Sequence, residues 1–236
     1  MSLRALVRDH ESISLKGPVA SLLLEFNLLP SRTLHPTQVA RLDPPEGLAH
    51  AQPAVAAALH KRWSARLLET LGSAGTPVLN GREPALPLAL ATPALLKQLA
   101  RDLGIALLGN YLRRVIDRQE VVALRSTLGM EGMVWALEGA PELHPGLPDP
   151  GKWLKADVHS ADHPAANAAD RLGAGLLAHA WHDAPAPLRQ RANWKLPPEG
   201  QSPEFREAHG LKEPQARELC LKRLSQLEPA WLSFFP

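Results

Sequence analysis

The chain has 236 residues, 45% of them apolar, which is enough to build one sizeable hydrophobic core. Its 26 Lys and Arg residues nearly balance its 24 Asp and Glu residues, so the net charge of +2 indicates neither nucleic-acid binding nor attraction to an anionic membrane. The single cysteine, Cys220, excludes an intrachain disulfide framework and a cysteine-based zinc site, and it favours a reducing, cytosolic location. The N-terminus "MSLRALVRDHES" lacks the apolar run of a signal peptide, and the longest apolar patches are too short to span a membrane, so we expect a soluble protein.

Leucine and alanine supply most of the apolar residues, whereas isoleucine occurs only at positions 13, 105 and 116 and tyrosine only at position 111. Helices favour Leu and Ala, and sheets favour β-branched and aromatic residues. We therefore expect an all-α protein: a compact, single-domain helical bundle of irregular topology over residues 1–236, with long Pro-rich loops. The Pro- and Gly-rich segment 139–151 is the candidate subdomain boundary within it.

The N-terminal third contains one long predicted helix and two short ones. Apolar residues at spacings of three and four predict a short helix through residues 19–26, and Pro36 opens another toward Leu42. Pro53 and Gly72 are typical of the start and end of a helix between them. Its expected apolar ridge is Val55, Leu59, Trp63, Leu67 and Leu71. Residues 73–91, punctuated by proline and glycine, are expected to form a connection.

In the middle of the chain, Thr92 and Pro93 predict a helix start as N-cap and first helical residue. This helix either runs through Gly109 to about Asp117 or breaks at Gly109, and its pattern does not distinguish the two. Residues 119–128 and 131–138 are expected to be further short helices, with Gly129 between them. A loop is expected at 139–151.

The last third begins with a helix that has Pro164 near its start and Pro185 beyond its end. Small residues at 169, 173 and 180 would let a neighbouring helix approach it closely. A short helix is expected at 186–194, followed by a loop. The final helix starts at Pro214 and presents Cys220, Leu224, Leu227 and Trp231 on one face, and Pro229 ends or kinks it.

Gly104 and Gly109 have the glycine spacing of a phosphate-binding loop. That loop requires Lys and then Ser or Thr after its second glycine, between a strand and a helix. Here Asn110 and Tyr111 follow, and the preceding residues are helical in pattern, so nucleotide binding is not expected. Because glycine within a helix costs roughly 1 kcal/mol relative to alanine, the pair instead indicates a close helix crossing or a break.

Two histidine pairs have spacings that could place two imidazoles on one metal ion. They are His159 with His163, and His179 with His182, which Asp183 follows. They define one alternative function, a helical metal-dependent hydrolase, against the simpler interpretation of solvated or capping histidines.

Other catalytic patterns are lacking. There is no G-x-S-x-G motif, Cys220 fits a core position, and Asp102, Asp117 and Glu120 fit helix surfaces. These residues give little support to nucleophilic or acid–base catalysis.

Two groups of residues are candidates for binding a protein partner. The first is the basic run Arg113, Arg114 and Arg118, with Arg125 beyond it, which is either a solvated helix face or a docking surface for an acidic partner. Arg113 and Asp117 are four residues apart, which predicts an ion pair within one helix. The second group is the apolar C-terminal tail with Trp231, Phe234 and Phe235. The six tryptophans are otherwise expected to be core anchors, one per element.

Four segments together resemble one protein family. The stretch "LARDLGIALLGNYLRRVIDRQEVVALRSTLG" is similar to the central motif of the SctK (YscK/PscK) family of bacterial type III secretion systems. The matching positions are Leu103, Gly104, Gly109, Arg113, Arg114, Leu124, Arg125, Leu128 and Gly129. The segments "EFNLLPSRTLHP", "RLGAGLLAHAWHDAPAPLRQRANWKLP" and "ARELCLKRLSQLEPAWLSFF" resemble its N-terminal, late-helix and closing segments. The resemblance covers residues 24–235, and this chain is longer in the loops 73–91 and 198–212.

The resemblance implies a cytoplasmic, non-enzymatic adaptor of the injectisome sorting platform, at the cytosolic face of the inner membrane. Its implied partners are the ring protein SctD and the pod protein SctQ, with SctL and the ATPase SctN connected indirectly. It implies no cofactor, no nucleic acid and no insertion into the membrane. A generic helical interaction module outside secretion is the remaining alternative.

Overall fold

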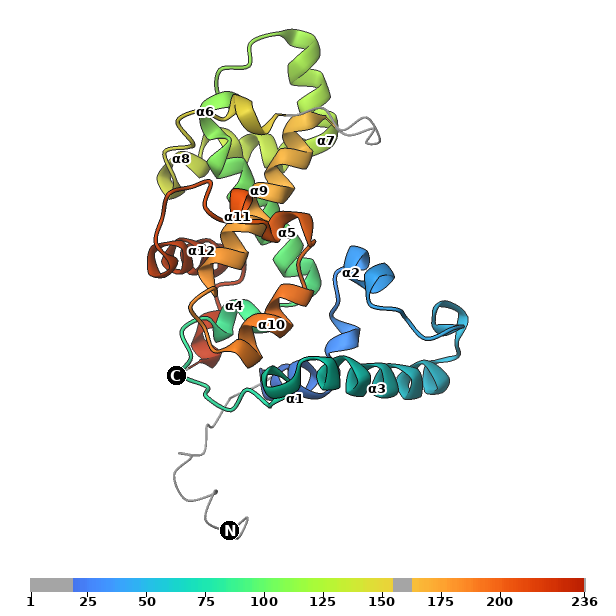
Figure 1. The fold of residues 1–236 in the computed structure, drawn as a ribbon. Coiled ribbons are helices and arrows are strands. Elements are labelled where there is room, and N and C mark those ends of the chain that lie inside the picture. The colour runs from blue at the N-terminus through green and yellow to red at the C-terminus, as the bar shows by residue number, and fades with distance from the viewer. Residues whose placement is uncertain (1–18, 155–162, 236) are drawn as a thin grey trace.

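The structure is a computed structural model that describes residues 19–154 and 163–235. These residues form α-helices, short 3-10 helices and loops but no strand, which confirms the all-α prediction (Figure 1). The α-helices are α1 (Val19–Leu28), α2 (Pro36–Arg41), α3 (Pro53–Thr70), α4 (Leu86–Leu90), α5 (Pro93–Leu107), α6 (Gly109–Leu112), α7 (Arg118–Leu137), α8 (Ala140–Leu143), α9 (Pro164–Ala180), α10 (Ala186–Trp194), α11 (Pro203–Arg206) and α12 (Glu213–Leu227). The 3-10 helices are η1 (Pro30–Arg32), η2 (Leu48–His50), η3 (Gly72–Gly75), η4 (Gly151–Trp153), η5 (Glu199–Gln201) and η6 (Trp231–Phe234).

The centre of the fold is the crossing of α5 and α9. A Cβ atom added to Gly104 of α5 would lie 1.8 Å from the carbonyl oxygen of Ala169, and one added to Gly173 of α9 would lie 1.7 Å from that of Ala100. The two helices therefore meet backbone to backbone, which only glycine allows at these positions. This confirms the close crossing predicted from the small residues, and Gly104 lies within helix α5, not after a strand as a phosphate-binding loop would require.

Helices α12, α11 and α7 pack against this crossing, and α4 and α10 extend the same core. Cys220 and Leu224 of α12 are fully buried, as the sequence predicts. The expectation of a plain connection at 73–91 is wrong, because Leu86–Leu90 forms helix α4, whose Leu86, Leu88 and Leu90 lie in the core. This helix has only five residues and is buried nearly all round, so it has too little length and too little polarity to produce a periodic pattern.

Helices α1, α2 and α3 form an arm, here defined as residues 19–72, which extends from the lower part of the body in Figure 1. Its own small core is made by Leu34, Trp63 and Leu67, against which Trp194 of α10 packs. The backbone N–H of His35 donates to the carbonyl of Trp194 at 2.9 Å and joins the arm to the body. Val55, expected on the apolar ridge of α3, is exposed because the packing partners of α3 end before its first turns.

The helical structure is interrupted at two glycines between α5 and α8. Helix α5 ends at Leu107, and the single turn α6 follows, so the helix breaks at Gly109 and does not continue to Asp117. Gly129 then kinks α7, with φ of 76°, a left-handed conformation that favours glycine. Part of the expected loop 139–151 is helical, since Ala140–Leu143 forms α8.

Candidate functional site: a docking surface on α7

The connection between α6 and α7 forms the upper end of the molecule in Figure 1. Arg113 fastens this connection: its Nη2 donates to Asn110 Oδ1 at 3.0 Å and to the carbonyl of Pro145 at 3.4 Å. A Cβ atom added to Gly109 would lie only 2.7 Å from Arg113 Nη1, so the glycine makes room for the guanidinium. Arg113 is therefore half-buried and has a structural role, whatever else it contacts.

The predicted ion pair between Arg113 and Asp117 is wrong, because the helix ends between these residues. Asp117 instead caps α7, and its carboxylate accepts from the backbone N–H groups of Gln119 and Glu120 at 2.9 Å. Glu120 accepts a hydrogen bond from the Tyr111 hydroxyl. Asp117 and Glu120 thus stabilise the turn and the start of α7. Neither carboxylate forms an ion pair with the arginines beside it among the residues that the structure describes.

Arg114 and Arg118 are exposed on this turn, on either side of Ile116, whose side chain is 93% exposed. Arg125 is also exposed, about two helical turns beyond Arg118 on α7. We name Arg114, Ile116 and Arg118 the basic turn. An exposed apolar side chain that lies between two exposed arginines in the sequence is typical of a protein-binding surface. The exposure of Ile116 was not predicted, because a single isoleucine gives no sequence signal of exposure.

A second feature lies beyond the Gly129 kink. Met130 and Leu137 are 63% and 56% exposed, and Val134 between them is 43% exposed. They lie on one face of α7, at helical spacings of four and three. Met130, Val134, Trp135, Glu131, Glu138 and Glu142 line a shallow groove of about 530 Å³, of which we call Trp135 the floor and the three glutamates the rim. We name this feature the α7 groove.

Trp135 is held in place from several sides. Its Nε1 donates to the carbonyl of Asp102 at 2.9 Å, and the guanidinium of Arg223 lies 3.5 Å from the ring centroid. Gly139 faces the ring edge, where a Cβ atom would lie 2.1 Å from Trp135 Cζ3. The floor of the α7 groove is therefore preorganised and does not depend on a partner to set its shape.

The Asp102 carboxylate completes this arrangement by pairing with Arg223 at 2.6 and 3.0 Å. Burial raises the pKa of Asp102 above its ordinary value, and the hydrogen bonds from Arg223 oppose that shift. The expectation that Asp102 fits a helix surface is wrong, since its residue is buried. Arg223 lies 121 residues further along the chain, a separation at which no sequence spacing could indicate the pair.

The C-terminal candidates lie mostly inside the molecule. Trp231 is only 6% exposed, and its Nε1 donates to the carbonyl of Pro87 at 2.9 Å, as for a core anchor. Phe234 and Phe235 are half-buried against the same core. They leave less apolar surface for a partner than the sequence suggests.

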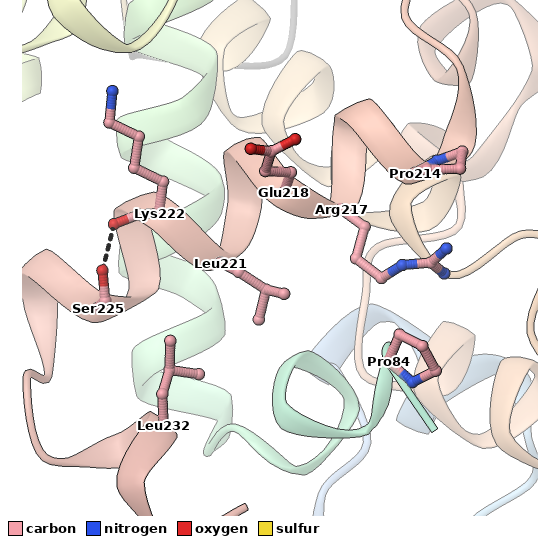
Figure 2. Close-up of a pocket in the computed structure, with 8 residues that line it drawn as sticks. All are labelled: Pro84, Pro214, Arg217, Glu218, Leu221, Lys222, Ser225 and Leu232. Carbon is pink, nitrogen blue, oxygen red and sulfur yellow. Dashed lines mark hydrogen bonds between the residues drawn. The ribbon is translucent and has the colours of Figure 1, made fainter. Parts of the chain in front are cut away.

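A shallow hollow of about 380 Å³ lies between α12, Pro84 and the C-terminal tail, as Figure 2 shows. Its cations already have contacts inside the chain. Arg217 pairs with Asp183 at 2.8 Å, and the ammonium of Lys222 donates to the carbonyl of Glu142 at 3.2 Å. The hollow therefore offers a partner little free positive charge.

The proposed metal ligands are not brought together in the described part of the chain. His163 caps α9 by accepting from the backbone N–H of Ala165 at 3.2 Å, and His159 lies outside the described residues. His179 and His182 stack, with 6.5 Å between ring centroids, but no group of three ligands that could hold a metal forms among residues 19–154 and 163–235. Asp183 is engaged with Arg217, which lowers the pKa of its carboxyl.

Residues 49–235 match a protein-family model described as YOP proteins translocation protein K (YscK). The match starts after "EFNLLPSRTLHP", so that segment lies outside it. No curated protein and no solved structure is significantly similar to the chain. Among the helices of the described ranges, none combines the length and hydropathy needed to cross a membrane.

Proposed function

The chain belongs to the YscK family and is therefore a type III secretion protein, and we propose that it acts there as a non-enzymatic adaptor of the sorting platform. In this role it links an SctD-like ring protein of the inner membrane to an SctQ-like pod protein. SctL and the ATPase SctN are its indirect partners. The proposal places it in the cytoplasm, at the cytosolic face of the inner membrane, and requires no nucleic acid, cofactor or membrane insertion.

The observation that carries the proposal is the presence of two separate exposed apolar surfaces. One is the surface of α7 with the basic turn, and the other is on helix α1 of the arm, where Leu24 and Leu28 are exposed one turn apart. These surfaces lie at opposite ends of the molecule in Figure 1. Exposed apolar groups rimmed by charge mark protein interfaces, and a protein that links two others needs two such surfaces.

The charge of the basic turn supports an acidic partner at the α7 end. Arg114 and Arg118 are exposed, and neither donates a hydrogen bond or forms an ion pair among the residues that the structure describes. Free cations on an interface rim speed encounter with an acidic surface and disfavour basic ones. The side chain of Ile116 between them supplies the apolar contact that such a rim needs.

The non-enzymatic part of the proposal is supported by the state of the reactive groups. The Cys220 thiol is fully buried, and burial raises its pKa well above the ordinary value, so it is a poor nucleophile. Asp183 is committed to Arg217, and His163 to a helix cap. None of these groups is free to act on a substrate.

The test is affinity purification of the tagged full-length chain from a secreting bacterium, with three variants compared. The wild type should recover both the SctQ-like and the SctD-like protein. Arg114→Glu/Arg118→Glu should lose one of them, and the matched reversal Lys61→Glu/Arg62→Glu on α3 should retain it. The melting temperature should change little in either, because all four residues are exposed.

Recovery of neither partner by the wild type, together with normal secretion after deletion of the gene, would contradict the adaptor. Equal recovery of both partners by all variants would exclude the basic turn from the interface and leave the adaptor role standing.

A further inference from the structure

The α7 groove differs in charge from the basic turn, although both lie on the same helix and its entry. The carboxylates of Glu131, Glu138 and Glu142 are exposed and form no ion pair among the residues that the structure describes. Lys222 bonds to the main chain of Glu142 at one end of the groove, and Arg223 beneath the floor is neutralised by Asp102. The rim of the groove is therefore acidic.

The groove has an apolar side. Met130 and Val134 line it from one face of α7, with Trp135 beside them, and Leu137 continues the apolar row beyond the groove. A row of apolar side chains along one helix face is the counterpart of the apolar face of another helix, which is the commonest way that a helical segment is bound in a groove.

We propose that the α7 groove binds an amphipathic helix of a partner protein, one whose apolar face is flanked by Lys or Arg residues. This inference rests on the proposed adaptor function and specifies the chemistry of one partner segment. The apolar face fills the groove over Met130 and Val134, and the flanking cations meet Glu131 and Glu138. The basic turn and the α7 groove then select two partner segments of opposite charge.

The preorganised floor matters to this proposal. Because Trp135 is fixed by Asp102, Arg223 and the space above Gly139, little side-chain entropy remains to be lost when a helix binds. The groove is thus suited to a partner segment that becomes ordered on binding.

The first test uses two synthetic 16-residue probes with full-length protein at low ionic strength, read by fluorescence anisotropy. Both carry leucines at helical spacings of three and four, flanked by lysines in one probe and by glutamates in the other. The lysine probe should bind wild type at least about tenfold more tightly, since its lysines meet the three exposed glutamates of the rim, which repel the glutamates of the other probe. Raising the salt concentration should reduce this preference.

Variants identify the groove as the binding site. Glu131→Lys/Glu138→Lys should reverse the preference between the two probes, a result that misfolding cannot produce. The matched reversal Glu69→Lys/Glu204→Lys, at exposed glutamates on α3 and α11, should leave the preference unchanged. Equal binding of both probes, or an unchanged preference in the groove variant, would overturn the proposal.

The natural occupant is identified by a photo-crosslinking amino acid at position 134 in the secreting bacterium. The proposal requires the crosslinked segment to carry Lys or Arg beside apolar residues at helical spacing, and to belong to another protein. Crosslinking to the basic turn of a second copy of this chain, to an acidic segment, or to nothing would contradict it. These failures leave the adaptor function intact if the wild type still recovers its two partners, so the two proposals fail separately.

Discussion

Replacing Gly104 by alanine tests whether the backbone contact of α5 and α9 holds the fold together. The new Cβ would lie 1.8 Å from the carbonyl oxygen of Ala169, whereas a carbon and an oxygen in contact are normally about 3.3 Å apart. The helices must therefore separate by roughly 1.5 Å. A gap of 0.5–1 Å already forfeits a quarter to a half of a dispersion contact.

The size of the effect follows from the side chains beside the crossing. The buried leucines nearest in sequence are Leu103, Leu107, Leu172 and Leu176. If each contributes about 2.5 kcal/mol by burial and loses about 40% of it, the crossing loses roughly 4 kcal/mol. Alanine returns about 1 kcal/mol as the better helix former, so the net loss is about 3 kcal/mol. For a chain of this size that corresponds to a fall in melting temperature of about 6–12 °C.

Urea unfolding followed by circular dichroism measures this loss, and Gly132→Ala in α7 is the matched control. A Cβ at Gly132 would meet only side-chain atoms, Leu128 Cβ at 3.3 Å and Ile105 Cδ1 at 3.4 Å, which can yield. That variant should stay within about 1 kcal/mol of wild type. If Gly104→Ala were as stable as wild type, the backbone contact would not be what sets the distance between α5 and α9.

Three further changes probe the surroundings of the docking surface. Arg113→Ala should lower the free energy of unfolding by about 1–2 kcal/mol because Asn110 loses its charged partner, whereas Arg114→Ala should change it by less than about 0.5 kcal/mol, both read by thermal denaturation. Burial lowers the pKa of His209 to about 4, so below pH 6.5 the unfolded chain binds a proton that the folded chain does not. Stability should therefore fall from pH 7.5 to pH 5 by about 2 kcal/mol, the loss being complete near pH 4, and His209→Asn should remove this part of the dependence. Gly139→Ala should displace Trp135, weaken the lysine probe and leave α5 and α9 intact, which near-UV circular dichroism and anisotropy can check together.

Local chemistry made much of the fold predictable. The starts of α3, α5 and α9 at Pro53, Pro93 and Pro164 follow from proline's fixed φ and its lack of an N–H group. The crossing of α5 and α9 follows from glycines that are expensive in helices unless a neighbour needs the space. Such signals depend on a few adjacent residues, so they survive without knowledge of the rest of the chain.

The α7 groove depends on residues that are far apart in sequence, and it could not be predicted in the same way. Met130 and Val134 are residue types typical of a core, and they are exposed because α7 kinks at Gly129 and no element among residues 19–154 and 163–235 covers them. From the sequence alone Asp102 fits an exposed helix surface, and only the structure shows that it is buried and paired with Arg223. The arginine run stays a prediction, and the structure divides it: Arg113 fastens the turn, whereas Arg114, Arg118 and Arg125 are exposed.

The position of Asp102 connects the core to the docking surface. It lies two residues before Gly104 on α5, its carbonyl holds Trp135, and its carboxylate holds the arginine stacked on that ring. A separation of α5 from α9 would therefore move the floor of the α7 groove as well as loosen the core. Gly104→Ala should weaken the lysine probe and reduce stability together, whereas Glu131→Lys/Glu138→Lys should change binding alone. If Gly104→Ala lowered stability yet left binding of the probe unchanged, the floor of the groove would be held by α7 and α12 without help from the helix crossing.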